Sequence, residues 1–159
     1  MKLAQGDMWS VYDQADLFLV TTNSVLNRHG ALVMGAGIAR QTKERFPGLD
    51  AALGNAVVQA GDTYGLLVSP RWFIPPDGSG PTAKLGAFQT KIHWHDPSSP
   101  ELINFSTSKL LTWCKAHSTA RVHLNMPGVG LGGLSREQVL PMLESLPDTV
   151  TVWEYAPRS

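Results

Sequence analysis

The sequence predicts a single α/β domain with a largely parallel central sheet. Three observations support this fold class. Apolar strand-like runs alternate with helix-like segments along most of the chain, which is the order typical of a sheet covered by helices. A glycine-rich segment follows two of these strands. The chain of 159 residues shows no internal repeat and no linker, so we expect residues 1–159 to form one domain.

Apolar runs and stop signals set the order of the elements. Strands are expected at residues 1–5, 16–22, 63–69, 85–89, 121–125 and 150–155. The run at 16–22 (DLFLVTT) is continuous and β-branched, which is typical of a strand buried on both faces. Two helices are expected at 38–46 and 49–60, ended by Pro47-Gly48 and by Gly61. A proline- and glycine-rich stretch at 75–81 is expected to be an exposed loop.

Serine caps predict two further helices. Ser98 with Glu101 forms a capping-box pattern, and Ser99 before a proline is an equally good start for a helix reaching about His117. Ser135 with Gln138 forms a second capping box, opening a helix to about Leu146. Pro141 should bend this last helix or delay its start, because proline lacks the N–H that the helix needs.

The composition excludes several classes of protein. Thirteen Lys and Arg balance thirteen Asp and Glu, so no overall field attracts nucleic acid. The single cysteine, Cys114, excludes an internal disulfide and a multi-cysteine metal site, and we expect it to lie in the core. The apolar runs are far shorter than the ~20 residues of a membrane span, and the start does not resemble a signal peptide. We therefore expect a cytoplasmic protein without a membrane partner.

Two segments share one order of a strand, a glycine-rich loop and a helix start. The first leads from residues 16–22 to Met34-Gly35-Ala36-Gly37 and a helix from Ile38. The second leads from 121–125 to residues 127–133 (PGVGLGG) and the helix capped by Ser135. Ligands of α/β sheets bind outside the carboxyl ends of strands, and glycine lets backbone N–H groups approach a phosphate. Either loop alone reads as an ordinary turn, but the pair predicts a site for a phosphorylated small molecule.

The common nucleotide-binding motifs are absent. A dinucleotide fingerprint requires glycine at position 40, where this chain has Arg40. The chain also has no GxxxxGK[ST] segment for a phosphate-binding P-loop. Arg40 and its neighbours Lys43, Glu44 and Arg45 are expected to form a solvated helix face.

Taken together, four segments resemble the macrodomain family, which binds ADP-ribose. Gly6-Asp7-Met8 resembles the family's Gly-Asp-Ile turn after the first strand, and Thr22-Asn23 resembles the asparagine after its second strand. Residues 33–39 (VMGAGIA) resemble its first ligand loop, and residues 127–134 resemble its second. The matches span nearly the whole chain. The resemblance implies a three-layer α/β/α fold with a mixed, largely parallel sheet.

Within the family, the sequence MGAGIA resembles the branch that contains the terminal ADP-ribose glycohydrolase and the macrodomain of the DarG antitoxin. Residues 90–94 (TKIHW) resemble a DarG segment in which the lysine is catalytic. The glycohydrolase has an aspartate in the second loop where this chain has Gly132, and DarG-type proteins have glycine there. This difference favours the DarG side over a two-residue Lys/Asp mechanism.

The resemblance implies one catalytic residue, Lys91. Its amine either attacks the anomeric carbon or stays charged and stabilises the phosphates or the leaving group, and the sequence leaves both roles open. Asp7 would accept a hydrogen bond from the adenine amine, and Asn23 would bind the distal ribose or simply form an Asx turn. The expected ligand-binding residues are Asp7, Met8, Asn23, Gly35, Ala36, Gly37, Ile38, Thr90, Gly128, Val129, Gly130, Leu131, Gly132, Trp153 and Tyr155.

Aromatic and histidine residues near these segments leave further alternatives. Family members often pack an aromatic side chain on adenine, and only one of Trp153 and Tyr155 is expected to do so. His93 and His95 would share one face of a strand, but nothing elsewhere completes the three or four ligands of a zinc site. We therefore expect no metal and no cofactor.

Three functions remain open at this point. The first is an ADP-ribosyl glycohydrolase that removes ADP-ribose from a modified target, with ADP-ribosylated DNA expected first and ADP-ribosylated protein as the alternative, in an antitoxin-like role. The second is a reader module that binds ADP-ribose without turnover. The third is a phosphatase acting on ADP-ribose 1″-phosphate. The expected partners are ADP-ribose and its modified substrate, and the expected state is a monomer.

Overall fold

Six strands form one mixed sheet at the centre of the molecule. The computed structural model describes residues 1–68 and 84–155, and the loop expected at 75–81 lies outside them. The strands are β1 (Lys2–Gln5), β2 (Leu17–Thr22), β3 (Leu66–Val68), β4 (Lys84–Gln89), β5 (Val122–Asn125) and β6 (Val150–Glu154). Their order is β1-β6-β5-β2-β4-β3. Every neighbouring pair is parallel except β3 with β4, which confirms the mixed, largely parallel sheet.

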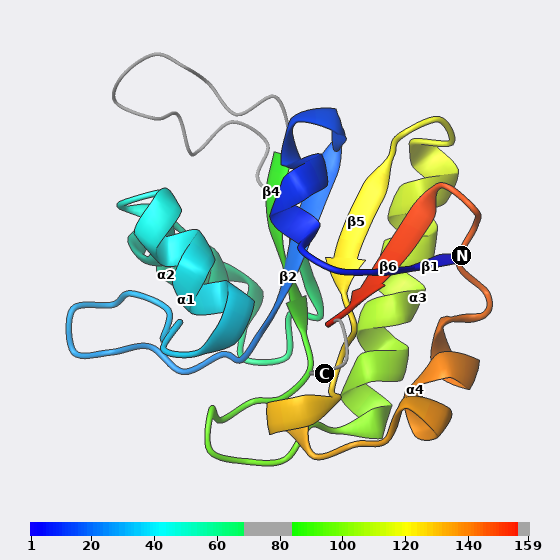
Figure 1. Ribbon diagram of the computed structural model, residues 1–159. Helices are drawn as coiled ribbons and strands as arrows, with labels where there is room; N and C mark the ends of the chain where they lie inside the picture. The colour runs from blue at the N-terminus through cyan, green and yellow to red at the C-terminus, as the bar shows by residue number, and fades with distance from the viewer. Residues whose placement is uncertain (69–83, 156–159) are drawn as a thin grey trace.

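Helices cover both faces of this sheet and complete a three-layer α/β/α fold (Figure 1). The helices are η1 (Met8–Gln14), α1 (Gly37–Arg45), α2 (Leu49–Ala60), α3 (Pro100–Ala116) and α4 (Arg136–Leu143), and a short 3-10 helix, η2 (Gly130–Gly132), lies in the second glycine loop. Alternate residues of β2 serve the two layers: Phe18 and Val20 pack with η1, α1 and α2, whereas Leu17 and Leu19 pack with α3 and α4. The continuous apolar run is therefore buried on both faces, as expected, and Cys114 lies buried in the layer of α3.

The helix boundaries follow their caps, and of the two starts that the sequence left open for α3 the structure has the one at Ser99. Helix α3 is capped by Ser99, whose hydroxyl accepts a hydrogen bond from Leu102 N at 3.2 Å, and not by Ser98. The capping box of Ser135 and Gln138 opens α4 as predicted. Pro141 does not delay that start. The helix ends at Leu143, with Glu144 as its C-cap, rather than near residue 146.

Two further differences lie at the edge that carries the ligand loops. The 3-10 helix η1 was not predicted, and the carboxylate of Asp7 caps it by accepting a hydrogen bond from Trp9 N at 3.0 Å. Strand β3 begins at Leu66 rather than residue 63, because Gly65 has a φ of +73°, outside the range of extended backbone.

The two central strands β2 and β5 separate at their carboxyl ends. They pair only from Leu17 with Val122 to Leu19 with Leu124. Beyond that register the side chain of Asn125 bridges them: its Oδ1 accepts from Thr21 N at 3.0 Å and its Nδ2 donates to Thr21 Oγ1 at 2.8 Å. The chain leaves β2 towards α1 on one face and leaves β5 towards α4 on the other. This is a topological switch point, where open α/β sheets bind their ligands.

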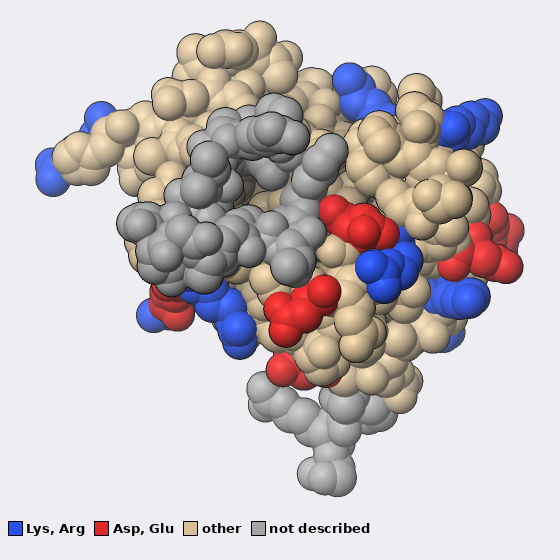
Figure 2. Space-filling view, turned by 90° about the horizontal axis from the view of Figure 1, so that it is seen from above, with Lys and Arg blue, Asp and Glu red and all other residues tan. Residues whose placement is uncertain are grey.

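Helix length and one face of the surface bear on the expectations drawn from composition. Among residues 1–68 and 84–155, no helix is long and apolar enough to span a bilayer. Figure 2 shows the face at the amino ends of the parallel strands, where acidic and basic side chains lie among one another. The overall charge balance of the sequence therefore holds locally on that face.

Candidate ligand-binding and catalytic site

The segments predicted to bind a ligand meet along one edge of the sheet. Because the strands are parallel, the connections after β1, β6, β5, β2 and β4 all emerge at their carboxyl ends. In spatial order these connections begin at Gly6, Tyr155, Met126, Asn23 and Thr90. Strand β3 is antiparallel, so the residues that precede it join the same edge. The fold therefore brings together the predicted site segments from five strands.

The first glycine loop presents its backbone to solvent between two buried anchors. Met34 and Ile38 are buried, whereas Gly35, Ala36 and Gly37 between them are exposed. Helix α1 starts here with Ala36 at its N-cap and no side-chain cap, whereas α4 after the second loop is capped by its serine. The first N–H groups of α1 thus lack a side-chain acceptor, which is the arrangement that suits an anion.

Asn23 holds the start of this loop. Its Nδ2 donates to Val33 O at 3.0 Å, and its Oδ1 accepts from Val25 N at 2.8 Å. The buried phenol of Tyr64 donates to Asn23 O at 2.6 Å, and burial raises the pKa of that phenol. Asn23 therefore forms the Asx turn that was the alternative to ribose binding, and its role in binding stays a prediction.

The second glycine loop repeats the pattern of buried ends and an exposed middle. Gly128 and Gly132 are buried, and Val129, Gly130 and Leu131 are exposed. A Cβ on Gly128 would lie 2.8 Å from Ile103 Cδ1, and its φ is +77°, so glycine is required there. Leu134 N donates to Gly128 O at 2.9 Å and closes the loop. The exposed middle supplies backbone N–H groups beside the gap between β2 and β5.

Lys91 lies in a loop that is hydrogen-bonded to the end of β2 and to the second glycine loop. On either side of it, Thr90 N donates to Thr22 O at 3.0 Å and Ile92 O accepts from Ser24 N at 2.9 Å. The buried amide of Gln89 donates to Lys91 O at 3.3 Å. At the far end of the loop, Ser98 N donates to Gly132 O at 2.8 Å. The backbone of Lys91 is therefore fixed relative to the end of β2 and to the second glycine loop, while its side chain stays half-buried.

Two predicted ligand-binding residues turn their side chains inward. Met8 and Thr90 are each 3% exposed, and Thr90 Oγ1 lies 3.5 Å from Thr22 O. Because these side chains are buried, only the backbone of the two residues is left to contact a ligand. Neither interior position was evident from the sequence, because both follow directly on strand ends that were expected to be open.

The end of the site at β1 and β6 holds Asp7 and two aromatic residues. Asp7 is exposed, and one carboxylate oxygen caps η1. Trp153 packs against the core, and its Nε1 donates to His123 Nδ1 at 2.9 Å. Burial, and next the nearby Arg121, hold the pKa of His123 below its ordinary value, which keeps Nδ1 free to accept. Tyr155 is 72% exposed, so it is the aromatic residue free to meet a ligand.

His93 and His95 do not lie on a strand, contrary to the expectation. Strand β4 ends at Gln89, and both histidines follow in a turn in which their rings touch edge to face. Asp96 lies 3.8 Å from His95 Nε2. Across residues 1–68 and 84–155, no group of three His, Cys, Asp or Glu side chains is arranged to hold a metal ion.

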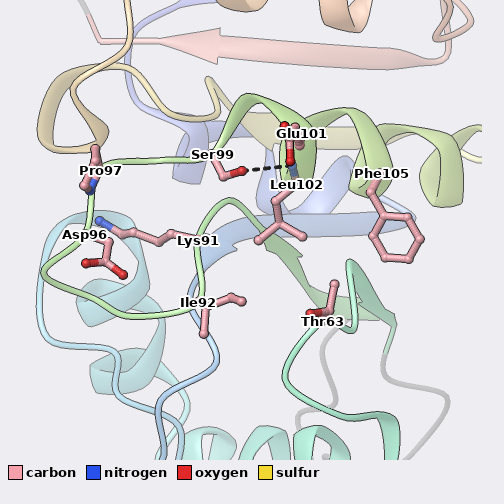
Figure 3. A pocket seen from close by; sticks show the side chains of 9 residues that line it. All are labelled: Thr63, Lys91, Ile92, Asp96, Pro97, Ser99, Glu101, Leu102 and Phe105. Atoms are coloured by element: carbon pink, nitrogen blue, oxygen red, sulfur yellow. Dashed lines mark hydrogen bonds between the residues drawn. The ribbon is translucent and has the colours of Figure 1, made fainter.

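A pocket of 380 Å³ adjoins the Lys91 loop and was not predicted (Figure 3). Its walls come from three places: the segment before β3, the loop after β4, and the start of α3 with its cap. The lining residues are Thr63, Lys91, Ile92, Asp96, Pro97, Ser99, Glu101, Leu102 and Phe105. In Figure 3 the Lys91 side chain runs towards Asp96 and Pro97, away from the part of the pocket formed by Leu102 and Phe105.

The fold and its paired loops define a macrodomain, and the chain belongs to the macrodomain family. No protein-family model matches the chain. The solved macrodomain of Thermus aquaticus DarG is similar over 98% of this chain and 97% of its own, with 27% identity and a TM-score of 0.75. Thermosipho africanus DarTG, solved in complex with ADP-ribose, shares the fold with 22% identity and a TM-score of 0.76, over 98% of this chain and 42% of its own.

A curated relative gives the same affiliation. The DNA ADP-ribosyl glycohydrolase of Mycobacterium tuberculosis is 32% identical over 148 residues, which cover 89% of this chain. The chain spans 40% of the length of that relative. The resemblance to the DarG branch, first drawn from the loops and the lysine segment, is confirmed.

Proposed function

We propose that this macrodomain is an ADP-ribosyl glycohydrolase that removes ADP-ribose from DNA. The observation that carries the proposal is the position of Lys91, in a loop hydrogen-bonded to the end of β2 and to the second glycine loop. The similarity to a protein named DNA ADP-ribosyl glycohydrolase supports the choice of reaction and of DNA as the target. ADP-ribose is the ligand of the related DarTG structure, and its diphosphate suits the two exposed loops.

ADP-ribose would lie along the carboxyl edge of the sheet. Four strand spacings of ~4.8 Å separate β1 from β4, so the edge offers ~19 Å from Asp7 to Lys91. Adenine would rest at Asp7 and Tyr155, with the amine donating to the carboxylate oxygen that does not cap η1. The diphosphate would accept hydrogen bonds from both glycine loops, which places the distal ribose beside Lys91.

The reaction transfers the ADP-ribosyl group from a base nitrogen to water. The glycosidic C–N bond breaks, water supplies the hydroxyl that ends on the anomeric carbon, and a proton ends on the base nitrogen. Lys91 acts either as the nucleophile that first takes the anomeric carbon or as a cation that stabilises the departing charge. Gly132 supplies no carboxylate in the second loop, so Lys91 is the residue to which we assign the chemistry.

Release of free ADP-ribose tests this function directly. The wild-type protein is incubated separately with an ADP-ribosylated single-stranded oligonucleotide and an ADP-ribosylated protein, and free ADP-ribose is quantified over time. We expect release from the oligonucleotide. Release from the protein substrate alone would reassign the target, and tight binding of ADP-ribose with no release from either would make the domain a reader.

A further inference from the structure

One part of the pocket beside Lys91 lies between α3 and the segments opposite it, and we call this part the slot. Leu102 and Phe105 project from α3 on one side, and Ile92 and Thr63 face them across the space (Figure 3). Leu102 is buried, whereas Ile92 and Phe105 remain 46% and 40% exposed, so apolar surface lies open at the mouth. A volume of 380 Å³ is near the lower end for small-molecule sites, which suits one ring system rather than a peptide segment.

The position of Phe105 is fixed by its neighbours. A Cβ on Gly65 would lie 2.9 Å from Phe105 Cε2, so the ring rests directly against the glycine backbone. Lys109, one turn further along α3, holds its ammonium 5.2 Å from the centre of the ring. The ring is therefore positioned before any ligand arrives, which lowers the entropy cost of stacking against it.

The polar groups at the slot end of the pocket suit N–H donors. Glu101 contributes a carboxylate and Thr63 contributes a hydroxyl, whereas the Lys91 side chain runs towards Asp96 at the other end. Carboxylates accept hydrogen bonds from ring and exocyclic N–H groups and repel phosphate oxygens. The exposed Lys109 lies outside this set, next to Phe105, where a strand phosphate would meet a positive charge.

From these observations we propose that the pocket holds the base of the nucleotide next to the modified one in a single-stranded DNA substrate. The inference rests on the proposed function. The Lys91 side chain runs away from the slot towards Asp96 and Pro97, so the reacting base and the base in the slot lie on different sides of the lysine backbone. A stacked base held by an aromatic ring, with a lysine for its phosphate, is a common mode of single-strand recognition.

The test uses short single-stranded oligonucleotides that carry one ADP-ribosylated base. One set has normal neighbours, and two others have an abasic residue on the 5′ or on the 3′ side. We expect one abasic substitution to lower kcat/KM of the wild type roughly tenfold. Phe105→Ala should lower kcat/KM for the normal substrate to that same level and show no further loss on the abasic one. Affinity for free ADP-ribose should not change.

Controls separate this pocket from general effects. Val58→Ala removes an exposed apolar side chain from α2 and should leave all rates unchanged. Lys109→Gln should make KM less sensitive to salt, because one phosphate contact is lost. If Phe105→Ala does not fold, Ile92→Ser at the exposed mouth replaces it and should reproduce the loss on the normal substrate.

The outcomes distinguish the pocket from the function. Equal rates on normal and abasic oligonucleotides overturn the base site and leave the proposed function standing. If the wild type releases no ADP-ribose, its affinity for the same three oligonucleotides is measured by fluorescence anisotropy. Equal affinities for the three would overturn the base site. A loss confined to ADP-ribosylated protein substrates would assign the pocket to a peptide side chain and overturn it as well.

Discussion

Ser98 occupies the space that a side chain on Gly132 would need. Ser98 N donates to Gly132 O at 2.8 Å, and a Cβ built on Gly132 would clash with Ser98 Oγ and lie 3.2 Å from Ser98 Cβ. The contact joins the Lys91 loop to the second glycine loop. It also gives a physical reason why a side chain is not accommodated at this position of the second loop.

Gly132→Asp is expected to destabilise the protein by about 1–3 kcal/mol, because the new side chain overpacks a buried position. Combining it with Ser98→Gly removes the clashing atoms and should recover part of that loss. Thermal unfolding of both single variants and the double variant measures how far the effects of the two substitutions on stability depend on each other. Strictly additive effects would show that Ser98 is not the obstacle.

Lys91→Ala should reduce ADP-ribose release by about 10²–10³-fold. It should weaken ADP-ribose binding by no more than about 1.5–3 kcal/mol, the value of one charge-assisted contact. Single-turnover rates and calorimetry measure the two effects, with Lys115→Ala at the exposed end of α3 as the matched control.

Lys91→Arg then separates the two roles of the lysine. Arginine keeps the charge but does not readily form a covalent adduct. Full recovery of the rate supports electrostatic stabilisation. Failure to recover, together with a borohydride-trapped adduct on the wild type, supports the nucleophile. An alanine variant as fast as the wild type would remove Lys91 from the mechanism.

Gly35→Val should abolish ADP-ribose binding without unfolding the protein. Gly35 does not have a positive φ, and a Cβ there meets nothing within 4 Å, so the backbone tolerates the change. The added methyl groups would project from the exposed loop where we place the diphosphate. Calorimetry should show at least a roughly tenfold loss. Ala51→Val on exposed α2 controls for added bulk, and wild-type affinity in Gly35→Val would move the diphosphate elsewhere.

Asp7→Asn tests the adenine site separately from stability. Asparagine caps helices about as well as aspartate, so η1 should persist, but its amide donor opposes the adenine amine. Affinity for ADP-ribose should fall, whereas affinity for ribose 5-phosphate should not change. Asp7→Ala should in addition cost about 1 kcal/mol of stability, since the cap is lost. Equal losses for both ligands would reject adenine recognition by Asp7.

The free energy of unfolding should fall as the pH drops below about 6.5, partly through His123. The folded protein holds the pKa of this imidazole below its ordinary value, mainly through burial, so the unfolded chain takes up the proton first as the pH falls. The contribution of His123 to the free energy of unfolding is complete above the pKa of the unfolded chain. It is lost as the pH falls through the pKa of the folded protein. His123→Gln should flatten this part of the pH dependence in urea unfolding between about pH 7.5 and about pH 5. An unchanged slope would show that His123 does not titrate with folding.

Local patterns were enough to predict most of the fold. The apolar run of β2, the capping box at Ser135 and the stop at Gly61 depend on residues close in sequence, and the structure confirms each. The two glycine loops followed from the same reasoning. By contrast, η1 depends on Asp7 acting as a cap, and an aspartate next to a glycine reads equally well as a simple turn.

The parts of the site that escaped prediction depend on residues distant in sequence. The slot beside Lys91 needs Thr63, Ile92 and Phe105, which belong to three separate elements. The acceptor for the Trp153 indole is His123, on the neighbouring strand. Spacing along the chain carries no signal for such contacts, because only the strand order of the folded sheet brings the partners together.

The fastening of the Lys91 loop also sets the order in which the site is completed during protein synthesis. Thr22 and Ser24 leave the ribosome before Lys91, but Gly132, which accepts the hydrogen bond from Ser98, follows later. At translation rates of ~5–20 residues per second, Gly132 is synthesised a few seconds after Lys91, so the hydrogen bond from Ser98 forms only after that interval. Nascent chains of intermediate length therefore carry Lys91 without the backbone geometry that holds it in place.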